Sequence, residues 1–343
     1  MSNSESPERR KRRGADNPTL ADVARESGVS TITVSRVLNS PDSVRQATRE
    51  RVEAAIERVG YVRNMLAGSL ASADSRFIAV IVPSLSNVVF VEVIHGLQIT
   101  FEKHGYQILL GNTEYDMRRE HELVQTFLGW SSSALVITGL RHDPACTAML
   151  KRWQKPVMEI MELGQGIDLN VGLSHYEAGR CMAQHLLDRG YRRIVYAGAQ
   201  MDGNYRARLR YEGHRDLLEA HGLEAPLEEW PEASALEIGA KAFRHVMVQR
   251  PGTEAIHFAD DTLAAGAILH ANRAGIRVPD DVAIAGFTGL PFGQHITPRL
   301  TTIFSPREAI GRIAAEQIIA RIEGRPIRPT YDVGFELVVG ESA

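Results

Sequence analysis

The sequence predicts an α/β protein in which a small helical head precedes a larger body built around parallel β-sheets. Three observations support this fold class. Two short helical patterns separated by a glycine lie between residues 20 and 39. From residue 77 onward, continuous apolar runs alternate with helical patterns, as is typical of buried parallel strands covered by helices. The length of 343 residues and a hydrophobic content of 44% suffice for two or three folded units.

Charge is distributed unevenly along the chain. Residues 1–63 contain 12 Lys and Arg against 9 Asp and Glu, a net charge of +3, whereas the remainder contains 27 against 33 and carries −6. A basic head on an acidic body indicates that the head meets a polyanion. Residues 1–17, with the run Arg9 to Arg13, are predicted to form a flexible basic arm. Two interpretations of the run stay open: a solvated tail, and an arm that contacts DNA.

The sequence has neither an apolar run of eighteen residues nor the apolar stretch of a secretion signal near its N-terminus. We therefore expect no membrane partner and a cytoplasmic location. Cys146 and Cys181 have no partner motif, which fits a reducing compartment better than a disulfide or a metal site.

The stretch "LADVARESGVSTITVSRVLN", residues 20–39, predicts two helices joined by a tight turn. Apolar residues recur at helical spacing on both sides of Gly28, which supplies the positive φ that ends the first helix. Ser30 stands where a hydroxyl caps the second helix. A third helix, from about Gln46 to Val59, is expected to complete a small core. The expected core residues are Leu20, Val23, Ala24, Val34, Val37, Leu38, Val52, Ile56 and Val59.

These helices form a predicted helix-turn-helix unit, residues 18–63, whose second helix enters the major groove of DNA. Thr31, Ile32 and Arg36 are expected to face base edges, and Arg36 is expected to pair with a guanine. The alternative is a solvated helical hairpin inside a larger bundle, with Arg36 merely exposed. Leu20 is added to the predicted DNA-binding face, and the residues assigned to phosphates are Thr19, Ser30, Thr33, Ser35 and Asn39.

The segments "TLADVARESGVSTITVSRVLN", "TRERVEAAIERVGYVRN" and "LAGSLAS" closely resemble the DNA-binding head and hinge of the LacI/GalR family. The resemblance implies a hinge helix and linker over residues 64–75 that folds only on operator DNA. It adds Asn64 and Leu70 to the DNA-binding residues, with Leu70 inserted into the minor groove. Arg45 departs from the family, because many members start the third helix with a serine cap there; Ser43 is the alternative cap.

The body, residues 76–343, is predicted from apolar strand patterns that fall into two series, which indicate two sheets. In open α/β sheets, ligands bind beyond the carboxyl ends of the strands. The patterns are "FIAVIVP", "YQILLGN", "ALVITG" and "PVMEIME" in the first series, and "RIVYAGA", "AIHFADD" and "VAIAGFTG" in the second.

Polar residues follow several of these strands and are candidates for a ligand site. For each, the alternative is a helix cap or a loop residue. That alternative is favoured for Asp261 as an N-cap, and Arg208 is favoured as a solvated neighbour. An arginine in "YRARLR" fits a carboxylate ligand. The candidates are Ser84, Asn87, Phe90, Glu159, Glu162, Arg206, Arg208, Arg210, Asp260, Asp261 and Thr288.

No enzyme motif accompanies these candidates. The sequence lacks G-x-G-x-x-G, Walker, G-x-S-x-G, H-E-x-x-H and C-x-x-C patterns. The histidines at 95, 104, 121 and 142 have no metal spacing, and we expect most of them to be exposed. The body is therefore predicted to bind a small molecule without catalysis, cofactor or metal.

The family resemblance extends to nearly the last residue of the body. It implies two subdomains like those of periplasmic sugar-binding proteins, joined by three crossovers. The first comprises about residues 76–172 and 304–330, and the second about 173–303 and 331–343. By position, Arg210 matches the family's effector-binding arginine, Asp260 a ligand-contacting asparagine and Phe90 an aromatic near the effector. Thr288 replaces an aspartate found in many members, which favours an anionic ligand. The predicted effector-binding set is Ser84, Asn87, Phe90, Glu162, Arg206, Arg210, Asp260 and Thr288.

One branch of the family, the repressors of gluconate utilisation, is singled out by "IVPSLSNVVFVEVIHG", "HGYQILL", "VGLSHYEAGR" and "AIAGFTGLPFGQHITPRLTTIFSPREAIG". The resemblance implies a homodimeric repressor on a pseudo-palindromic operator, released by gluconate or 6-phosphogluconate. The alternatives are a repressor that answers 2-ketogluconate or another sugar acid, a transport binding protein and, least favoured, an enzyme acting on a sugar acid. The chain lacks leucine heptads after "FELVVGESA", which predicts a dimer rather than a tetramer. The expected dimer faces lie around 90–101 and 310–322.

Overall fold

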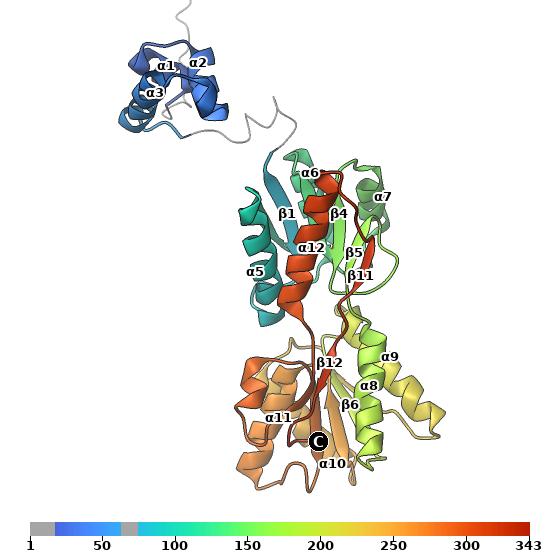
Figure 1. Ribbon diagram of the computed structural model, residues 1–343. Helices are drawn as coiled ribbons and strands as arrows, with labels where there is room; N and C mark the ends of the chain where they lie inside the picture. The colour runs from blue at the N-terminus through green and yellow to red at the C-terminus, as the bar shows by residue number, and fades with distance from the viewer. Residues whose placement is uncertain (1–17, 63–74) are drawn as a thin grey trace, which may run out of the picture. The chain divides into compact units, whose positions relative to one another are not determined.

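The structure is a computed structural model that describes residues 18–62 and 75–343 (Figure 1). The chain divides into two compact units, a head within residues 1–71 and a body within residues 72–343. The predicted basic arm, residues 1–17, and the hinge residues Asn64 and Leu70 lie outside the described residues. The interpretations of these segments therefore remain predictions.

The head consists of three α-helices whose ends follow the local sequence. The Asp22 amide donates to Thr19 Oγ1 (3.4 Å) and the Thr19 amide donates to Asp22 Oδ2 (2.9 Å), which is a capping box. Gly28 ends the first helix with a φ of 64°, and Ser30 Oγ accepts from the Thr33 amide at 3.2 Å. Both predicted turn residues are confirmed. The elements are α1 (Leu20–Ser27), α2 (Thr31–Asn39), the 3-10 turn η1 (Pro41–Ser43) and α3 (Gln46–Val59).

The core of the head takes side chains from all three helices. Val23 of α1, Val34 of α2 and Val52 of α3 are fully buried. The other predicted core residues, Ala24, Leu20, Val37, Leu38, Ile56 and Val59, are buried or pack against this cluster. Fully burying a valine contributes roughly 1.5–3 kcal/mol, so this small core is the main support of the head.

The start of α3 lacks a side-chain cap. Arg45 occupies the N-cap position and makes no capping hydrogen bond, and the Ser43 hydroxyl donates instead to the Ser40 carbonyl at 2.6 Å. The alternative cap proposed for Ser43 is therefore wrong, because its hydroxyl closes the preceding 3-10 turn.

The body contains two six-stranded sheets, as predicted. The first has the order β11-β5-β4-β3-β1-β2 and is entirely parallel, and the second has the order β12-β10-β9-β8-β6-β7 with only β12 antiparallel. The strands are β1 (Phe77–Val82), β2 (Gln107–Asn112), β3 (Ala134–Thr138), β4 (Val157–Ile160), β5 (Leu169–Gly172), β6 (Ile194–Ala199), β7 (Leu227–Trp230), β8 (Ala255–Phe258), β9 (Ala283–Thr288), β10 (Thr301–Phe304), β11 (Thr330–Asp332) and β12 (Glu336–Val338).

Helices cover both faces of each sheet. Along β1, Ile78 and Val80 belong to the core under α5 and α12, whereas Ala79 and Ile81 belong to the core under α6 and α7. The helices of the first subdomain are α5 (Val88–Lys103), α6 (Met117–Gly129), α7 (Pro144–Arg152) and α12 (Arg307–Ile322). Those of the second are α8 (His175–Asp188), α9 (Tyr205–Ala220), α10 (Leu236–Gln249) and α11 (Asp261–Ala274), with a 3-10 turn η2 (Pro291–Gln294).

Helices α5 and α12 lie side by side although more than two hundred residues separate them in sequence (Figure 1). Glycines permit this close approach: a Cβ atom on Gly96 would lie 2.3 Å from the Glu308 carbonyl oxygen, and one on Gly311 would lie 2.1 Å from the Val93 carbonyl oxygen. Any side chain at either position would force the two helices apart.

The chain crosses between the subdomains three times, after β5, after β10 and after β11. Because β11 pairs with β5 up to Asp332, the last crossing lies near residue 333 and not at the predicted boundary of 330. Arg307, 1% exposed, sits at the second crossing. Its guanidinium pairs with both carboxylate oxygens of Glu92 on α5 (3.0 and 3.2 Å) and donates to the Thr288 carbonyl at the end of β9.

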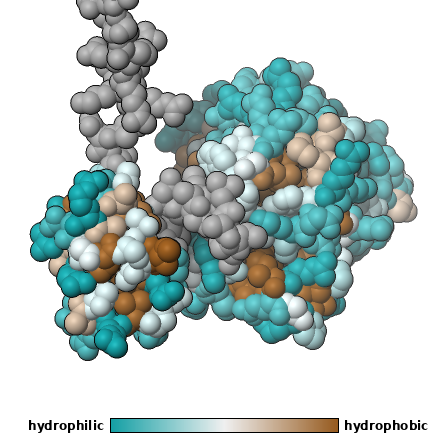
Figure 2. Space-filling view, turned by 90° about the horizontal axis from the view of Figure 1, so that it is seen from above, coloured by the Kyte–Doolittle hydropathy of each residue, from teal (hydrophilic) through white to brown (hydrophobic). Residues whose placement is uncertain are grey.

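The surface of the body is mainly hydrophilic at the end where its chain begins. Figure 2 looks at this end, and hydrophilic side chains cover most of it, with small separate apolar areas. Within residues 18–62 and 75–343, no helix is long and apolar enough to cross a membrane.

Candidate DNA-binding face and ligand cavity

The head presents a shallow surface depression formed by α1 and α2. Ile32 is 70% exposed although it is large and apolar, and Arg36 is exposed without an ion pair to a described residue. An exposed apolar side chain beside an unpaired arginine suits thymine methyl groups and guanine edges. The depression is lined by six residues, all predicted to bind DNA: Leu20, Thr31, Ile32, Ser35, Arg36 and Asn39.

The remaining predicted phosphate contacts in the head also serve as caps. The hydroxyl of Thr19 donates to Asp22 Oδ2 at 2.6 Å, and Ser30 Oγ lies 2.9 Å from Thr33 Oγ1. These side chains hold the starts of α1 and α2, and a contact with DNA phosphates stays a prediction for them.

The body contains a cavity of about 350 Å³ where the carboxyl ends of β1, β2 and β3 face the amino end of α9. The cavity thus lies between the two subdomains, at the carboxyl ends of the strands, where the ligand candidates were predicted from the sequence. Its charged and aromatic lining residues are Tyr115, Asp116, Glu120, Arg141, Asp202, Tyr205 and Arg206. Only Arg206 was among the predicted effector residues.

Each acid in the lining has a cationic partner. Asp116 Oδ2 lies 3.1 Å from Arg118, and Asp202 Oδ1 lies 3.7 Å from Arg208. Arg208 also pairs with Glu229 at 2.8 Å and does not itself line the cavity. Glu120 Oε1 lies 2.8 Å from His142 Nδ1.

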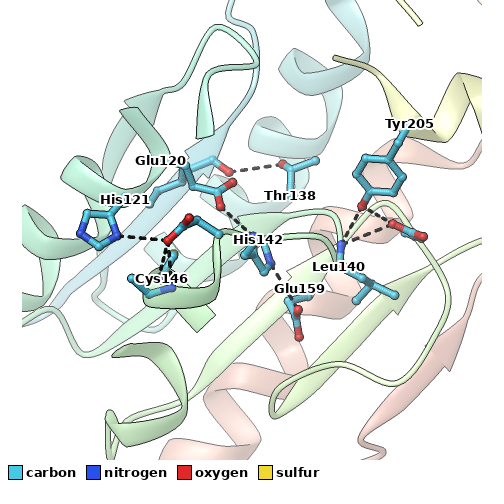
Figure 3. A network of polar contacts seen from close by, with 12 residues as sticks. Glu120, His121, Thr138, Leu140, His142, Cys146, Glu159 and Tyr205 are labelled. Atoms are coloured by element: carbon cyan, nitrogen blue, oxygen red, sulfur yellow. Dashed lines mark hydrogen bonds and ion pairs between the residues drawn. The ribbon is translucent and has the colours of Figure 1, made fainter. Parts of the chain in front are cut away.

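His142 lies behind the cavity wall between two glutamates (Figure 3). Its side chain is 1% exposed, against the expectation of an exposed histidine, and its Nε2 lies 3.3 Å from Glu159 Oε1. Burial lowers the pKa of His142, but the hydrogen bonds and charges of Glu120 and Glu159 outweigh burial and raise it from 6.5 to about 9. A protonated His142 therefore places one positive charge between two carboxylates and holds the loop that follows β3.

Two arginines of the lining have no such partner. Arg206 is 7% exposed, and neither Arg206 nor Arg141 makes a hydrogen bond or ion pair with a residue that the structure describes. Both contact the ring of Tyr205, with guanidinium carbons 4.5 Å (Arg141) and 5.3 Å (Arg206) from its centroid. A buried cation without an anion is costly, so this wall of the cavity favours an anionic ligand.

Glu162 is occupied by protein groups. Its carboxylate accepts from the Tyr205 hydroxyl, and the Leu140 amide donates to Tyr205 Oη at 2.8 Å and to Glu162 Oε2 at 3.3 Å (Figure 3). Burial raises the pKa of Tyr205 to about 12, so the phenol stays protonated. Glu162 thus fastens α9 to the first subdomain and does not line the cavity.

Arg210 lies deeper than Arg206 and is largely saturated. It donates to His175 Nδ1 (2.9 Å) and to the Ala259 carbonyl (3.0 Å), and its guanidinium carbon lies 4.0 Å from the ring centroid of Phe287. Burial, with the charges of Arg210 and Arg206, holds the pKa of His175 well below its usual range, so this ring accepts as a neutral imidazole. Of the three guanidinium nitrogens of Arg210, Nε alone has no hydrogen-bond partner among the described residues.

The two adjacent aspartates, Asp260 and Asp261, have roles that differ from those the sequence suggested. Asp260 is the N-cap of α11, accepting from the amides of Thr262 (2.9 Å) and Leu263 (3.0 Å). Asp261 is instead fully buried and accepts from Thr302 Oγ1 at 2.6 Å; burial raises its pKa to about 6. The favoured N-cap assignment of Asp261 is therefore wrong, because Asp260 already satisfies the first amides of the helix.

The other predicted effector residues lie near the strand ends but outside the cavity lining. Ser84 accepts from the Asn87 amide at 3.2 Å, and Asn87 Oδ1 caps α5 through the Val89 amide at 3.0 Å. Phe90 is 3% exposed and belongs to the core under α5. Thr288 is buried with a φ of 128°, and its hydroxyl donates to the Phe287 carbonyl.

Sequence reasoning missed three residues of the lining that matter most to its chemistry: Tyr115, Arg141 and Tyr205. Tyr115 follows β2 with a φ of 61°, and burial raises the pKa of its phenol. Arg141 lies in the loop "LRHDP", where no periodicity marks it. The only available signal was position, since each lies within a few residues of a strand end or helix start.

Comparisons with known proteins agree with this geometry. Residues 19–64 match the family model of bacterial regulatory proteins of the lacI family, and residues 183–343 match a periplasmic binding protein-like domain. The HTH-type transcriptional regulator GntR of Pseudomonas aeruginosa is 40% identical over 334 residues, which are 96% of this chain and 97% of that protein. GntR of Escherichia coli K12 is 36% identical over 327 residues, 95% of this chain and 98% of that protein.

Solved structures support the same fold. A LacI-family transcriptional regulator from Silicibacter pomeroyi is 39% identical, with a TM-score of 0.91 over 95% of this chain and 99% of that chain. GntR from Chromobacterium violaceum is 35% identical, with a TM-score of 0.74 over 78% and 98%. The lac repressor dimer bound to operator is 23% identical, with a TM-score of 0.82 over 95% and 99%, which is a likeness of fold alone. The predicted head and two-subdomain body are confirmed.

Proposed function

The chain belongs to the lacI family of bacterial regulatory proteins, and from this premise we propose that it represses genes of gluconate uptake and catabolism. Members of this family are DNA-binding transcriptional regulators and not enzymes. In the proposal, the repressor leaves its operator when gluconate, or 6-phosphogluconate, occupies the cavity of the body. The single observation that carries the effector class is the buried, unpaired guanidinium of Arg206 in the cavity wall.

Gluconate fits the chemistry of this cavity. It is an open-chain polyol with one carboxylate, and it needs one cation and several hydrogen-bonding groups. Arg206 supplies the cation, and Tyr115 supplies a phenol. Two relatives that are 40% and 36% identical carry the name GntR, which supports a sugar acid.

On DNA, we assign base reading to Thr31, Ile32 and Arg36, which share one exposed depression. Asn64 and Leu70 complete the predicted contact. Two heads are needed for a pseudo-palindromic operator, so the proposal includes a homodimer acting in the cytoplasm. Exposed apolar residues on and beside α5 support a dimer face there: Leu85 (45%), Val88 (49%), Val91 (50%), Ile99 (38%) and Leu110 (42%).

Operator titration with and without gluconate tests the proposal. Moving occupancy from 99% to 1% requires an affinity difference of about 10⁴-fold between the two states of the repressor, shared over two effector sites. We expect a large fall in operator affinity with gluconate, and an unchanged affinity would refute the effector.

A repressor answering 2-ketogluconate or another sugar acid is the alternative, and Arg206 favours any of these anions equally. Calorimetry with gluconate, 2-ketogluconate and 6-phosphogluconate separates the candidates. A transport binding protein is disfavoured by the DNA-binding head.

A further inference from the structure

We infer that the anionic group of the effector is held from both subdomains at once, by Arg206 on α9 and by Arg141 in the loop after β3. This inference rests on the proposed function for the identity of its ligand, and it adds a specificity-determining residue to the site. Arg141 was not among the predicted effector-binding residues.

The first support is the charge inventory of the cavity wall. Its three acids are matched by Arg118, His142 and Arg208, at distances of 3.1, 2.8 and 3.7 Å. Arg141 and Arg206 are left without a carboxylate among the residues described. Both guanidinium groups thus line the cavity without an ion partner, and a bound carboxylate or phosphate would pair with them.

The second support is the position of the two guanidinium groups. Both lie over one ring, that of Tyr205, at 4.5 and 5.3 Å from its centroid. Like charges gathered around one side chain repel each other, and a shared anion turns that repulsion into attraction. Because Arg141 and Arg206 belong to different subdomains, the same anion would also draw the subdomains together.

The third support is the construction of the loop that carries Arg141. A Cβ atom on Gly139 (φ 90°) would lie 2.5 Å from Tyr205 Oη and 2.9 Å from Arg206 Nη1. The positive φ favours glycine at this position, and a side chain there would displace the ends of Tyr205 and Arg206. The Leu140 amide bonds to Tyr205, and His142 is held by two glutamates, so the neighbours of Arg141 on both sides are fixed.

The inferred ligand class is a polyhydroxylated chain that bears a carboxylate or phosphate, and a neutral polyol of the same length should bind poorly. The experiment is calorimetry on the full-length protein with gluconate, 2-ketogluconate, 6-phosphogluconate and the neutral polyol glucitol. The variants are Arg141→Gln and Gly139→Ala, with Arg152→Gln, an exposed arginine on α7 outside the cavity lining, as the matched control. Arg141 is exposed, so its replacement should not disturb folding.

We expect Arg141→Gln to weaken binding of the preferred sugar acid by about 10- to 100-fold, the range for hydrogen bonds to charged groups. Its preference over glucitol should fall by the same factor. Gly139→Ala should also weaken binding, whereas Arg152→Gln should bind like the wild type. If Arg141→Gln keeps wild-type affinity and preference, the inferred role of Arg141 is wrong, and the proposed effector is unaffected. If the wild-type protein binds no member of the panel, the proposed effector class fails and the inference fails with it.

Discussion

The DNA-binding face of the head and the ligand cavity of the body recognise their partners in opposite ways. The face is built by one stretch of twenty residues, and its reading side chains are exposed, with Ile32 at 70%. The cavity is built by strand ends and a helix start spread over residues 81–206, and its Arg206 is 7% exposed. The exposed side chains of the head are accessible to a large polyanion, whereas the buried Arg206 is accessible only to a small anion that enters the cavity.

The largest expected effect distinguishes Arg210 from Arg206, both on α9. Arg210→Ala should lower the free energy of unfolding of the body by roughly 4 kcal/mol, because the His175 and Ala259 acceptors are left unsatisfied in the interior. Urea unfolding followed by tryptophan fluorescence measures this, with the surface-paired Arg208→Ala as control. A stable Arg210→Ala protein that had lost only ligand binding would make Arg210 a ligand residue like Arg206.

His142 should make the free energy of unfolding depend on pH by about 3 kcal/mol, because its folded pKa of about 9 exceeds its unfolded value of 6.5. A raised histidine pKa stabilises the fold fully below pH 6.5, and this contribution is lost as the pH rises through 9. The stability difference between wild type and His142→Gln should therefore shrink between pH 6.5 and 10. A constant difference for His142→Gln across this range would contradict the buried charge.

On the head, Arg36→Ala should weaken specific operator binding by about 1 to 3 kcal/mol, through the loss of a bidentate base contact. Binding of the sugar acid to the body should not change. Fluorescence anisotropy with operator and random duplexes measures both affinities, and Arg25→Ala on α1 is the control. Equal losses on both duplexes would assign Arg36 to phosphates.

The smallest expected effect is a gain in the stability of the head. Arg45→Ser should stabilise the head by about 1 kcal/mol, because α3 begins without a side-chain cap and a serine hydroxyl would accept from its free amides. Thermal unfolding of the full-length protein, read on the head transition, measures the shift. Arg45→Ala is the matched variant, and the same gain there would show that capping is not the cause.

The contrast between the regions also explains what could be predicted from the sequence. In the head, every helix and the turn residues Gly28 and Ser30 follow from spacing and turn chemistry that act within a few residues. In the body, the long apolar strands were evident. The short strand β5 and the polar β7, "LEEW", were not, because four residues carry too little pattern.

The cavity was harder for a different reason. Its location followed from the rule for carboxyl strand ends, but its chemistry depends on which side chains remain unpaired after folding. Arg208 and Arg206 look alike in "YRARLR", and only the fold gives Arg208 its partner Glu229. Arg141 meets Tyr205 across 64 residues of sequence, a contact that no local periodicity encodes.

The two sheets are both completed by the same late segment of the chain. Strand β11 pairs with β5, some 160 residues earlier, and β12 pairs with β10 in the other subdomain. On the ribosome, therefore, neither sheet can close until residues 330–338 have emerged. A nascent chain that stalls before this point presents two unpaired sheet edges, which are templates for aggregation.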